Sequence, residues 1–124
     1  MKVMLVEDTL LARERGTRTI RELGHEVIQG YDGDDAVRKF KDERPDVVIT
    51  DLNMPYMDGV EAIRMMRKTN PQAFIVVCSG SGDKDLIKKA LQAGAADVMP
   101  KPLSADQLKT VLSQVERRKP KYLI

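Results

Sequence analysis

Five short apolar runs alternate with five longer segments of helical periodicity, and this alternation leaves the chain few ways to fold. The runs are apolar throughout instead of alternating apolar with polar residues. That pattern is typical of strands in a parallel sheet that is covered on both faces. The runs are residues 2–6, 25–30, 46–50, 73–80 and 96–99. We therefore expect a buried parallel sheet.

The segments between the runs have the spacing and the boundaries of helices. Ala36, Val37 and Phe40 lie at helical spacing, and Ser104 with Gln107 has the pattern of a capping box. The helical segments are residues 9–23, 33–44, 58–70, 83–94 and 104–118. Each helix supplies the crossover that parallel neighbours need, so the order predicts one α/β domain. We expect it to span residues 1–119, with a short tail or linker at 120–124.

Composition excludes several classes of protein. The chain of 124 residues has the size of one domain, and its net charge of +2 is too small to indicate nucleic-acid binding. The single cysteine, Cys78, allows no intrachain disulfide and no Cys-rich metal site. The apolar start is too short for a signal peptide or a membrane helix. We expect a cytoplasmic protein whose domain binds neither membrane nor nucleic acid directly.

Polar side chains follow four of the five apolar runs, at the point where each run ends. In an open α/β sheet, ligands bind outside the carboxyl ends of the strands. If these four strands are neighbours, three carboxylates, a hydroxyl and an ammonium meet at one edge of the sheet. The polar residues are Glu7, Asp8, Asp51, Asn53, Ser79 and Lys101.

This set of side chains suits phosphoryl transfer. Three neighbouring carboxylates repel one another unless a cation neutralises them, and their hard oxygen atoms favour Mg²⁺. Lys101 adds a compact positive charge and Ser79 a hydrogen-bond donor. A metal ion, an ammonium and a hydroxyl are what a transferring phosphoryl group requires, and one carboxylate can act as the nucleophile that forms an acyl phosphate.

Each residue also has a plain structural interpretation. Glu7 and Asp8 could only complement the dipole of the first helix, and Asp58 is interpreted as the N-cap of the third. Lys101 alone would be a solvated surface charge, and His25 is expected to be structural. The coincidence of several features at one edge outweighs these separate explanations.

Four stretches carry a resemblance to a known family. "LVED", "TDLNMPYMDG", "VVCSGSGD" and "GAADVMPKP" resemble the signature stretches of the bacterial response-regulator receiver domain, the CheY-like module of two-component signalling. The resemblance covers nearly the whole chain. It implies a flavodoxin-like, doubly wound five-stranded parallel sheet of order 2-1-3-4-5 with five helices.

The resemblance also implies roles at the expected site. Asp51 matches the phosphoacceptor, supplied by a sensor histidine kinase or a phosphotransfer protein. Asp8 matches a direct Mg²⁺ ligand and Glu7 one that acts through water, while Asp51 and the backbone carbonyl of Asn53 complete the metal site. Lys101 matches the lysine that contacts the phosphoryl group.

Further residues are implied in the switch and in the lifetime of the signal. Ser79 matches the hydroxyl residue that turns toward the phosphoryl group, and the Lys101–Pro102 bond is expected to be cis. Val98 stands where the family commonly has an aromatic residue. We therefore predict that the switch acts mainly through residues 79–89. Asn53 and Ser81 occupy the positions that shape hydrolysis, and both are small and polar.

The implied function is a phosphorylation-switched module that controls an effector protein or an effector domain. It is not an enzyme in the ordinary sense, although it catalyses its own phosphorylation and dephosphorylation. One alternative is a Mg²⁺-dependent phosphatase with an aspartyl-phosphate intermediate; Asn53 argues against it, because an amide cannot act as the general acid. Another is a receiver-like binding module that is never phosphorylated, against which the presence of Asp8, Asp51, Ser79 and Lys101 argues.

Overall fold

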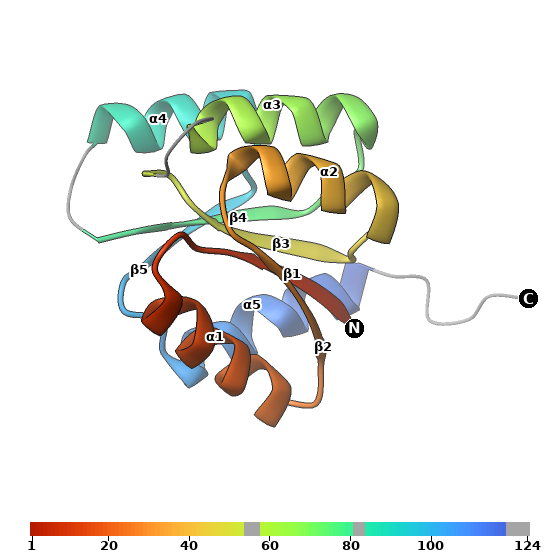
Figure 1. Cartoon of the computed structure of the whole chain (residues 1–124), viewed down its shortest axis with the longest axis vertical. Coiled ribbons are helices and arrows are strands. Elements are labelled where there is room, and N and C mark those ends of the chain that lie inside the picture. The colour runs from red at the N-terminus through yellow and green to blue at the C-terminus, as the bar shows by residue number, and fades with distance from the viewer. Residues whose placement is uncertain (54–57, 81–83, 119–124) are drawn as a thin grey trace, which may run out of the picture.

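Strands and helices alternate along the chain in the computed structural model, which describes residues 1–53, 58–80 and 84–118 (Figure 1). The strands are β1 (Lys2–Val6), β2 (Glu26–Gly30), β3 (Val47–Asp51), β4 (Ile75–Ser79) and β5 (Asp97–Pro100). The helices are α1 (Leu10–Glu22), α2 (Gly33–Glu43), α3 (Gly59–Thr69), α4 (Lys84–Ala93) and α5 (Ala105–Arg118). The expected tail at 120–124 lies outside the described residues.

The five strands form one parallel sheet in the order β2-β1-β3-β4-β5, which confirms the predicted topology. In Figure 1, α1 and α5 cover one face of the sheet, and α2, α3 and α4 cover the other. All strands point the same way, so the residues after β1, β3, β4 and β5 emerge along one edge. The structure thus supplies the adjacency on which the expected site depends.

Both faces of the sheet are buried, which explains why the strands lack polar alternation. Met4 and Val48 belong to the core beneath α2, α3 and α4, whereas Val3, Leu5 and Ile49 belong to the core beneath α1 and α5. Successive side chains of a strand point to opposite faces, so a strand covered on both sides needs apolar residues at every position.

Two predicted helix starts are confirmed by their caps. The Asp58 carboxylate accepts a hydrogen bond from the Glu61 amide at 2.8 Å, and the Ser104 hydroxyl accepts one from the Gln107 amide at 3.1 Å. Helix α1 differs, because its N-cap is Thr9, whose side chain makes no capping bond. The acids at positions 7 and 8 therefore precede the cap of α1.

Two glycines allow close packing around the end of the sheet. A Cβ atom on Gly16 would lie 2.7 Å from the Leu5 side chain, so glycine lets α1 pack tightly on β1. A Cβ atom on Gly59 would lie 2.6 Å from the Leu52 Cα and 2.7 Å from the Asp51 carbonyl oxygen. The start of α3 therefore packs directly behind the end of β3.

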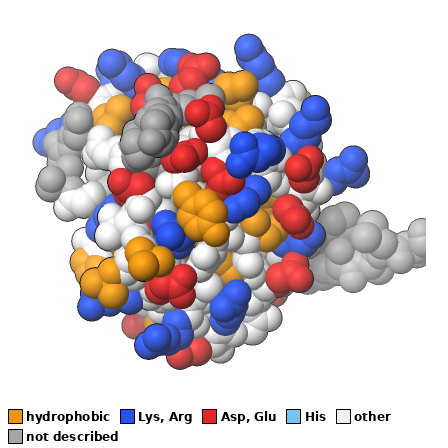
Figure 2. All heavy atoms as spheres, in the orientation of Figure 1, with side chains coloured by type: hydrophobic (Ala, Val, Ile, Leu, Met, Phe, Trp, Pro, Cys, Tyr) orange, Lys and Arg blue, Asp and Glu red, His pale blue; other side chains and the backbone are white. Residues whose placement is uncertain are grey.

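The surface includes several large apolar side chains of the helices. Leu10 and Leu11 are 63% and 59% exposed, and Met65 is 37% exposed. On the face drawn in Figure 2, acidic and basic side chains of the described residues are interspersed, without one continuous basic area. None of the helices described here combines the length and the apolar character needed to cross a membrane.

Candidate functional site

The carboxyl ends of four strands bring the expected polar residues together. Glu7 directly follows β1, and its amide donates a hydrogen bond to the Gly30 carbonyl oxygen at 3.0 Å. Asp51 is the last residue of β3 and Ser79 the last of β4. The Lys101 amide donates to the Ser79 carbonyl oxygen at 3.0 Å, which fixes the segment after β5 beside β4.

Three carboxylates form a cluster at this edge. Glu7, Asp8 and Asp51 each offer an oxygen atom, and these atoms all lie within 4.8 Å of one another. Glu7 and Asp51 are buried, each 6% exposed, whereas Asp8 is exposed. The cluster therefore has two buried carboxylates at the end of the sheet and one carboxylate that is open to solvent.

Lys101 is the cation that contacts this cluster. Its Nζ lies 2.6 Å from Oδ2 of Asp51 and 3.3 Å from Oε1 of Glu7. Partial burial opposes the ammonium charge, but the hydrogen bond from Lys101 to Asp51 and the charges of both acids outweigh it and raise the pKa of Lys101. The ammonium thus stays charged next to the carboxylate that we expect to react.

The arrangement leaves an excess of negative charge, which contributes to a raised pKa of Glu7. Burial raises the pKa of Glu7, the neighbouring Asp51 carboxylate raises it further, and Lys101 only partly opposes these effects. Three carboxylates against one ammonium favour the arrival of a divalent cation, and oxygen ligands of this kind suit Mg²⁺. The residues present therefore fit the expected metal ion.

The Asp51 side chain is held at both oxygen atoms. The Asn53 amide donates a hydrogen bond to Oδ1 at 3.2 Å, and Lys101 contacts Oδ2. The residue after Asp51 is also held in place, because the Gly59 amide donates a hydrogen bond to the Leu52 carbonyl oxygen at 3.0 Å. Asp51 is consequently presented in a defined direction.

The residues expected to act in switching lie nearby on β4 and β5. Ser79 is half-buried at the end of β4. Val98, on β5, pairs in register with Val77 and packs against the core beneath α2, α3 and α4. The Lys101–Pro102 peptide is cis, as predicted. Ser81 lies outside the described residues.

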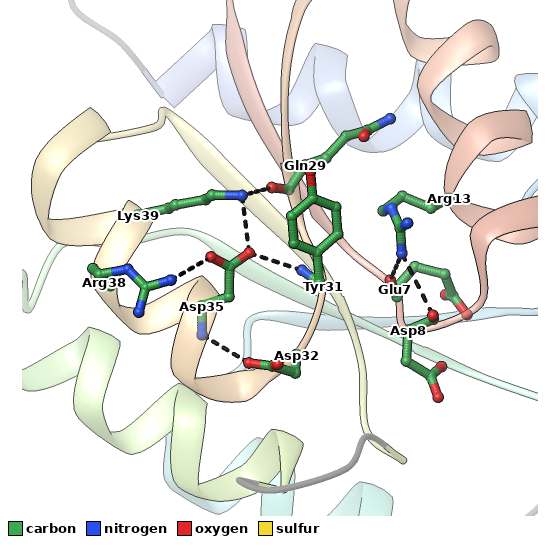
Figure 3. A network of polar contacts seen from close by, with 9 residues as sticks. All are labelled: Glu7, Asp8, Arg13, Gln29, Tyr31, Asp32, Asp35, Arg38 and Lys39. Atoms are coloured by element: carbon green, nitrogen blue, oxygen red, sulfur yellow. Dashed lines mark hydrogen bonds and ion pairs between the residues drawn. The ribbon is translucent and has the colours of Figure 1, made fainter.

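Sequence reasoning missed Arg13, a buried charged residue of α1. Its Nη1 donates to the Glu7 carbonyl oxygen at 2.8 Å and lies 3.4 Å from the Asp8 carbonyl oxygen (Figure 3). Arg13 shares the buried face of α1 with Gly16, Thr17 and Ile20. Only Ile20 of these is a large apolar residue, so hydrophobic spacing did not reveal that face.

Comparisons with known proteins agree with this geometry. The family model described as the response regulator receiver domain matches residues 3–113. The chemotaxis protein CheY of Thermotoga maritima is 34% identical over 117 residues, which cover 94% of this chain and 98% of that protein. A cyclic di-GMP phosphodiesterase of the same organism is 29% identical over 119 residues, which cover 96% of this chain but 32% of that longer protein.

A solved structure shows the same fold. The receiver domain of sensor histidine kinase PA1611 from Pseudomonas aeruginosa, with a magnesium ion coordinated in its active site cleft, matches with a TM-score of 0.85 and 28% sequence identity. The match covers 91% of this chain and 94% of that one. The family model and the relatives span nearly the whole sheet and its helices, and the chain therefore belongs to the CheY-like response regulator receiver domains of two-component systems.

Proposed function

We propose that this domain accepts a phosphoryl group on Asp51 from a phosphohistidine of a sensor histidine kinase or phosphotransfer protein, in a Mg²⁺-dependent reaction. The observation that carries the proposal is the setting of Asp51. Its carboxylate contacts Lys101 at 2.6 Å and clusters with the acids Glu7 and Asp8, at the edge of the sheet where ligands bind in open α/β folds.

The chemistry is a displacement at phosphorus. A carboxylate oxygen of Asp51 attacks the phosphorus atom, a P–O bond forms, and the P–N bond to the donor imidazole breaks. The electron pair of that bond stays on the imidazole nitrogen. Lys101 lies close enough to Asp51 for its ammonium to contact an oxygen atom of the phosphoryl group on Asp51. Negative charge is concentrated on these oxygen atoms during transfer.

Mg²⁺ would be held by Asp8, by Asp51, by the backbone carbonyl of Asn53 and, through water, by Glu7. When bound, the ion neutralises the carboxylates and the oxygen atoms of the phosphoryl group. The cluster of carboxylate oxygen atoms supports this assignment. The Pseudomonas aeruginosa neighbour, which carries magnesium in its cleft, supports it as well.

The output we propose is a conformational switch. Ser79 lies at the end of β4, beside the segment that carries Lys101, and we propose that its hydroxyl turns toward the phosphoryl group. Val98 cannot supply the swing of an aromatic ring, so we assign the main response to residues 79–89. The receiver of the longer Thermotoga maritima relative is joined to further sequence, which supports control of an effector domain or of a separate effector protein.

Acetyl phosphate with Mg²⁺ tests the proposal, with intact-mass measurement as the readout. We expect one phosphoryl group on the wild type, none on Asp51→Asn, and none when EDTA removes the metal. We also expect the label to disappear within minutes, because Asn53 and Ser81 shield it poorly. Equal labelling of the wild type and Asp51→Asn would contradict the assignment. Sustained release of phosphate from many donor molecules would identify a phosphatase, and inertness would identify an unphosphorylated binding module.

A further inference from the structure

We infer that Arg13 positions the acidic loop for the metal ion and that Tyr31 holds Arg13 in place. This inference rests on the proposed metal site. It assigns a part of the Mg²⁺ affinity to two residues that are not ligands.

Arg13 contacts the backbone on both sides of Asp8. Its Nη1 donates to the Glu7 carbonyl oxygen at 2.8 Å and lies 3.4 Å from that of Asp8. The first oxygen belongs to the peptide that enters Asp8 and the second to the peptide that leaves it. Because peptide groups are planar, holding their oxygen atoms limits the rotation of the backbone at Asp8. The direction of the Asp8 side chain follows from that backbone.

Arg13 is held in turn by Tyr31. The guanidinium carbon lies 4.4 Å from the centroid of the Tyr31 ring, and the Lys39 ammonium lies 4.1 Å from the same centroid. The Tyr31 amide donates to Asp35 at 3.0 Å, and the Asp35 carboxylate also pairs with Lys39 at 2.9 Å (Figure 3). The ring therefore lies between two cations and is anchored to the first turn of α2.

Packing alone does not explain why a guanidinium is buried here. Arg13 is 8% exposed, and its Nε is buried without a hydrogen-bond partner among the described residues. Burying an unsatisfied donor destabilises the folded chain. An apolar side chain would avoid this cost, but it could not contact the carbonyl oxygens of Glu7 and Asp8, which the two N–H donors of Nη1 can reach together.

The charge of Arg13 and its position have opposite effects on metal binding, which makes the inference testable. A positive charge near the cluster repels Mg²⁺, so its removal would tighten binding if charge were the main contribution. If positioning dominates, removal frees the acidic loop and weakens binding. Loss of residues that orient metal ligands typically lowers affinity roughly 10–100-fold.

The experiment is calorimetric titration of the full chain with Mg²⁺. We expect Arg13→Gln to weaken binding roughly 10-fold. Arg13→Lys keeps the charge but is shorter and lacks the planar group that lies over the Tyr31 ring, so it should also weaken binding. Tyr31→Phe should bind as the wild type does, and Tyr31→Ala should bind more weakly. Arg18→Gln is the matched control, because Arg18 is an exposed arginine of the same helix, and its affinity should not change.

Thermal unfolding in EDTA shows that each variant is folded at the temperature of the titration. Should Arg13→Gln fold poorly, the exposed Tyr31→Ala variant carries the test instead. Binding as tight as that of the wild type, or tighter, by folded Arg13→Gln or Tyr31→Ala overturns the inference and leaves the proposed function standing. If the wild type itself binds no Mg²⁺, or Asp8→Asn binds it equally well, the proposed metal site has failed instead.

Discussion

At the scale of single residues, the environment of a side chain decides whether it reacts. Asp51 and Cys78 pair in register on neighbouring strands, yet their chemistry differs. Asp51 faces an ammonium and two carboxylates at the edge of the sheet, whereas Cys78 is 2% exposed in the core beneath α1 and α5. Burial, with a smaller contribution from Glu7, raises the pKa of the Cys78 thiol to about 12.

A thiol of this kind should be inert in the folded protein, because the thiolate is the reactive form. We predict that iodoacetamide at about pH 8 modifies Cys78 only as fast as the protein unfolds. Mass spectrometry of samples taken with and without urea measures both rates. Rapid modification without urea, at a rate close to that of a free cysteine, would contradict the prediction.

At the scale of elements, the start of α3 packs so closely behind β3 that Gly59 has no room for a side chain. Gly59 packs against the backbone of Leu52 and the carbonyl oxygen of Asp51, so any side chain here must push α3 away from the sheet. The displaced backbone includes the residue that we expect to be phosphorylated. Stability and reactivity are therefore linked at this glycine.

We predict that Gly59→Ala lowers the free energy of unfolding by about 1–3 kcal/mol, the usual range for overpacking. Phosphorylation by acetyl phosphate should slow as well. Gly80→Ala is the control for stability, because among the described residues a Cβ atom there would meet only the Lys101 side chain, at 3.9 Å. Urea unfolding and intact-mass kinetics measure the two effects. If the two variants have equal free energies of unfolding, α3 can shift to accommodate the added methyl group, and the prediction is wrong.

The sequence pattern was sufficient for the elements but not for every contact between them. Apolar runs place the five strands because a strand buried on both faces has no polar positions. The order of the strands came from the family resemblance, since periodicity says nothing about which strands are neighbours. Leu10 and Leu11 lie outside the buried face of α1, where Arg13 and Thr17 are buried instead, so hydrophobicity alone was a poor guide. The stack of Arg13 on Tyr31 joins α1 to the end of β2, and no local pattern encodes such a contact.

At the scale of the whole molecule, the ion pairs of α2 affect stability in acid. Asp35 pairs with Arg38 at 2.7 Å and with Lys39 at 2.9 Å. Burial opposes its charge, but the hydrogen bonds from Lys39 and the Tyr31 amide outweigh burial and lower the pKa of Asp35 below 3.8. The unfolded chain therefore takes up this proton first. The contribution of Asp35 to stability is complete above pH 3.8 and is lost as the pH falls through the lowered pKa.

We predict that Asp35→Asn is less stable than the wild type by about 1–3 kcal/mol near neutral pH, because Lys39, Arg38 and the Tyr31 amide lose a charged hydrogen-bond partner. The difference should shrink as the pH falls below 3.8, where the wild-type carboxyl becomes neutral too. Asp34→Asn, at an exposed position of the same turn, should match the wild type throughout. Urea unfolding at several pH values gives the free energy of unfolding of the three proteins as a function of pH. A difference between the wild type and Asp35→Asn that does not change with pH would contradict the prediction.

The contact of Lys101 with the acids has a consequence for the synthesis of the chain. Lys101 lies 94 residues after Glu7 and 50 residues after Asp51, so the ribosome makes both acids long before it makes their counter-ion. A nascent chain that ends at β4 already carries Asp51, the proposed nucleophile, but lacks the ammonium beside it. If Asp51 accepts a phosphoryl group as we propose, it becomes competent to do so only when the last strand has docked, and a kinase acting on nascent chains would leave incomplete ones unmodified.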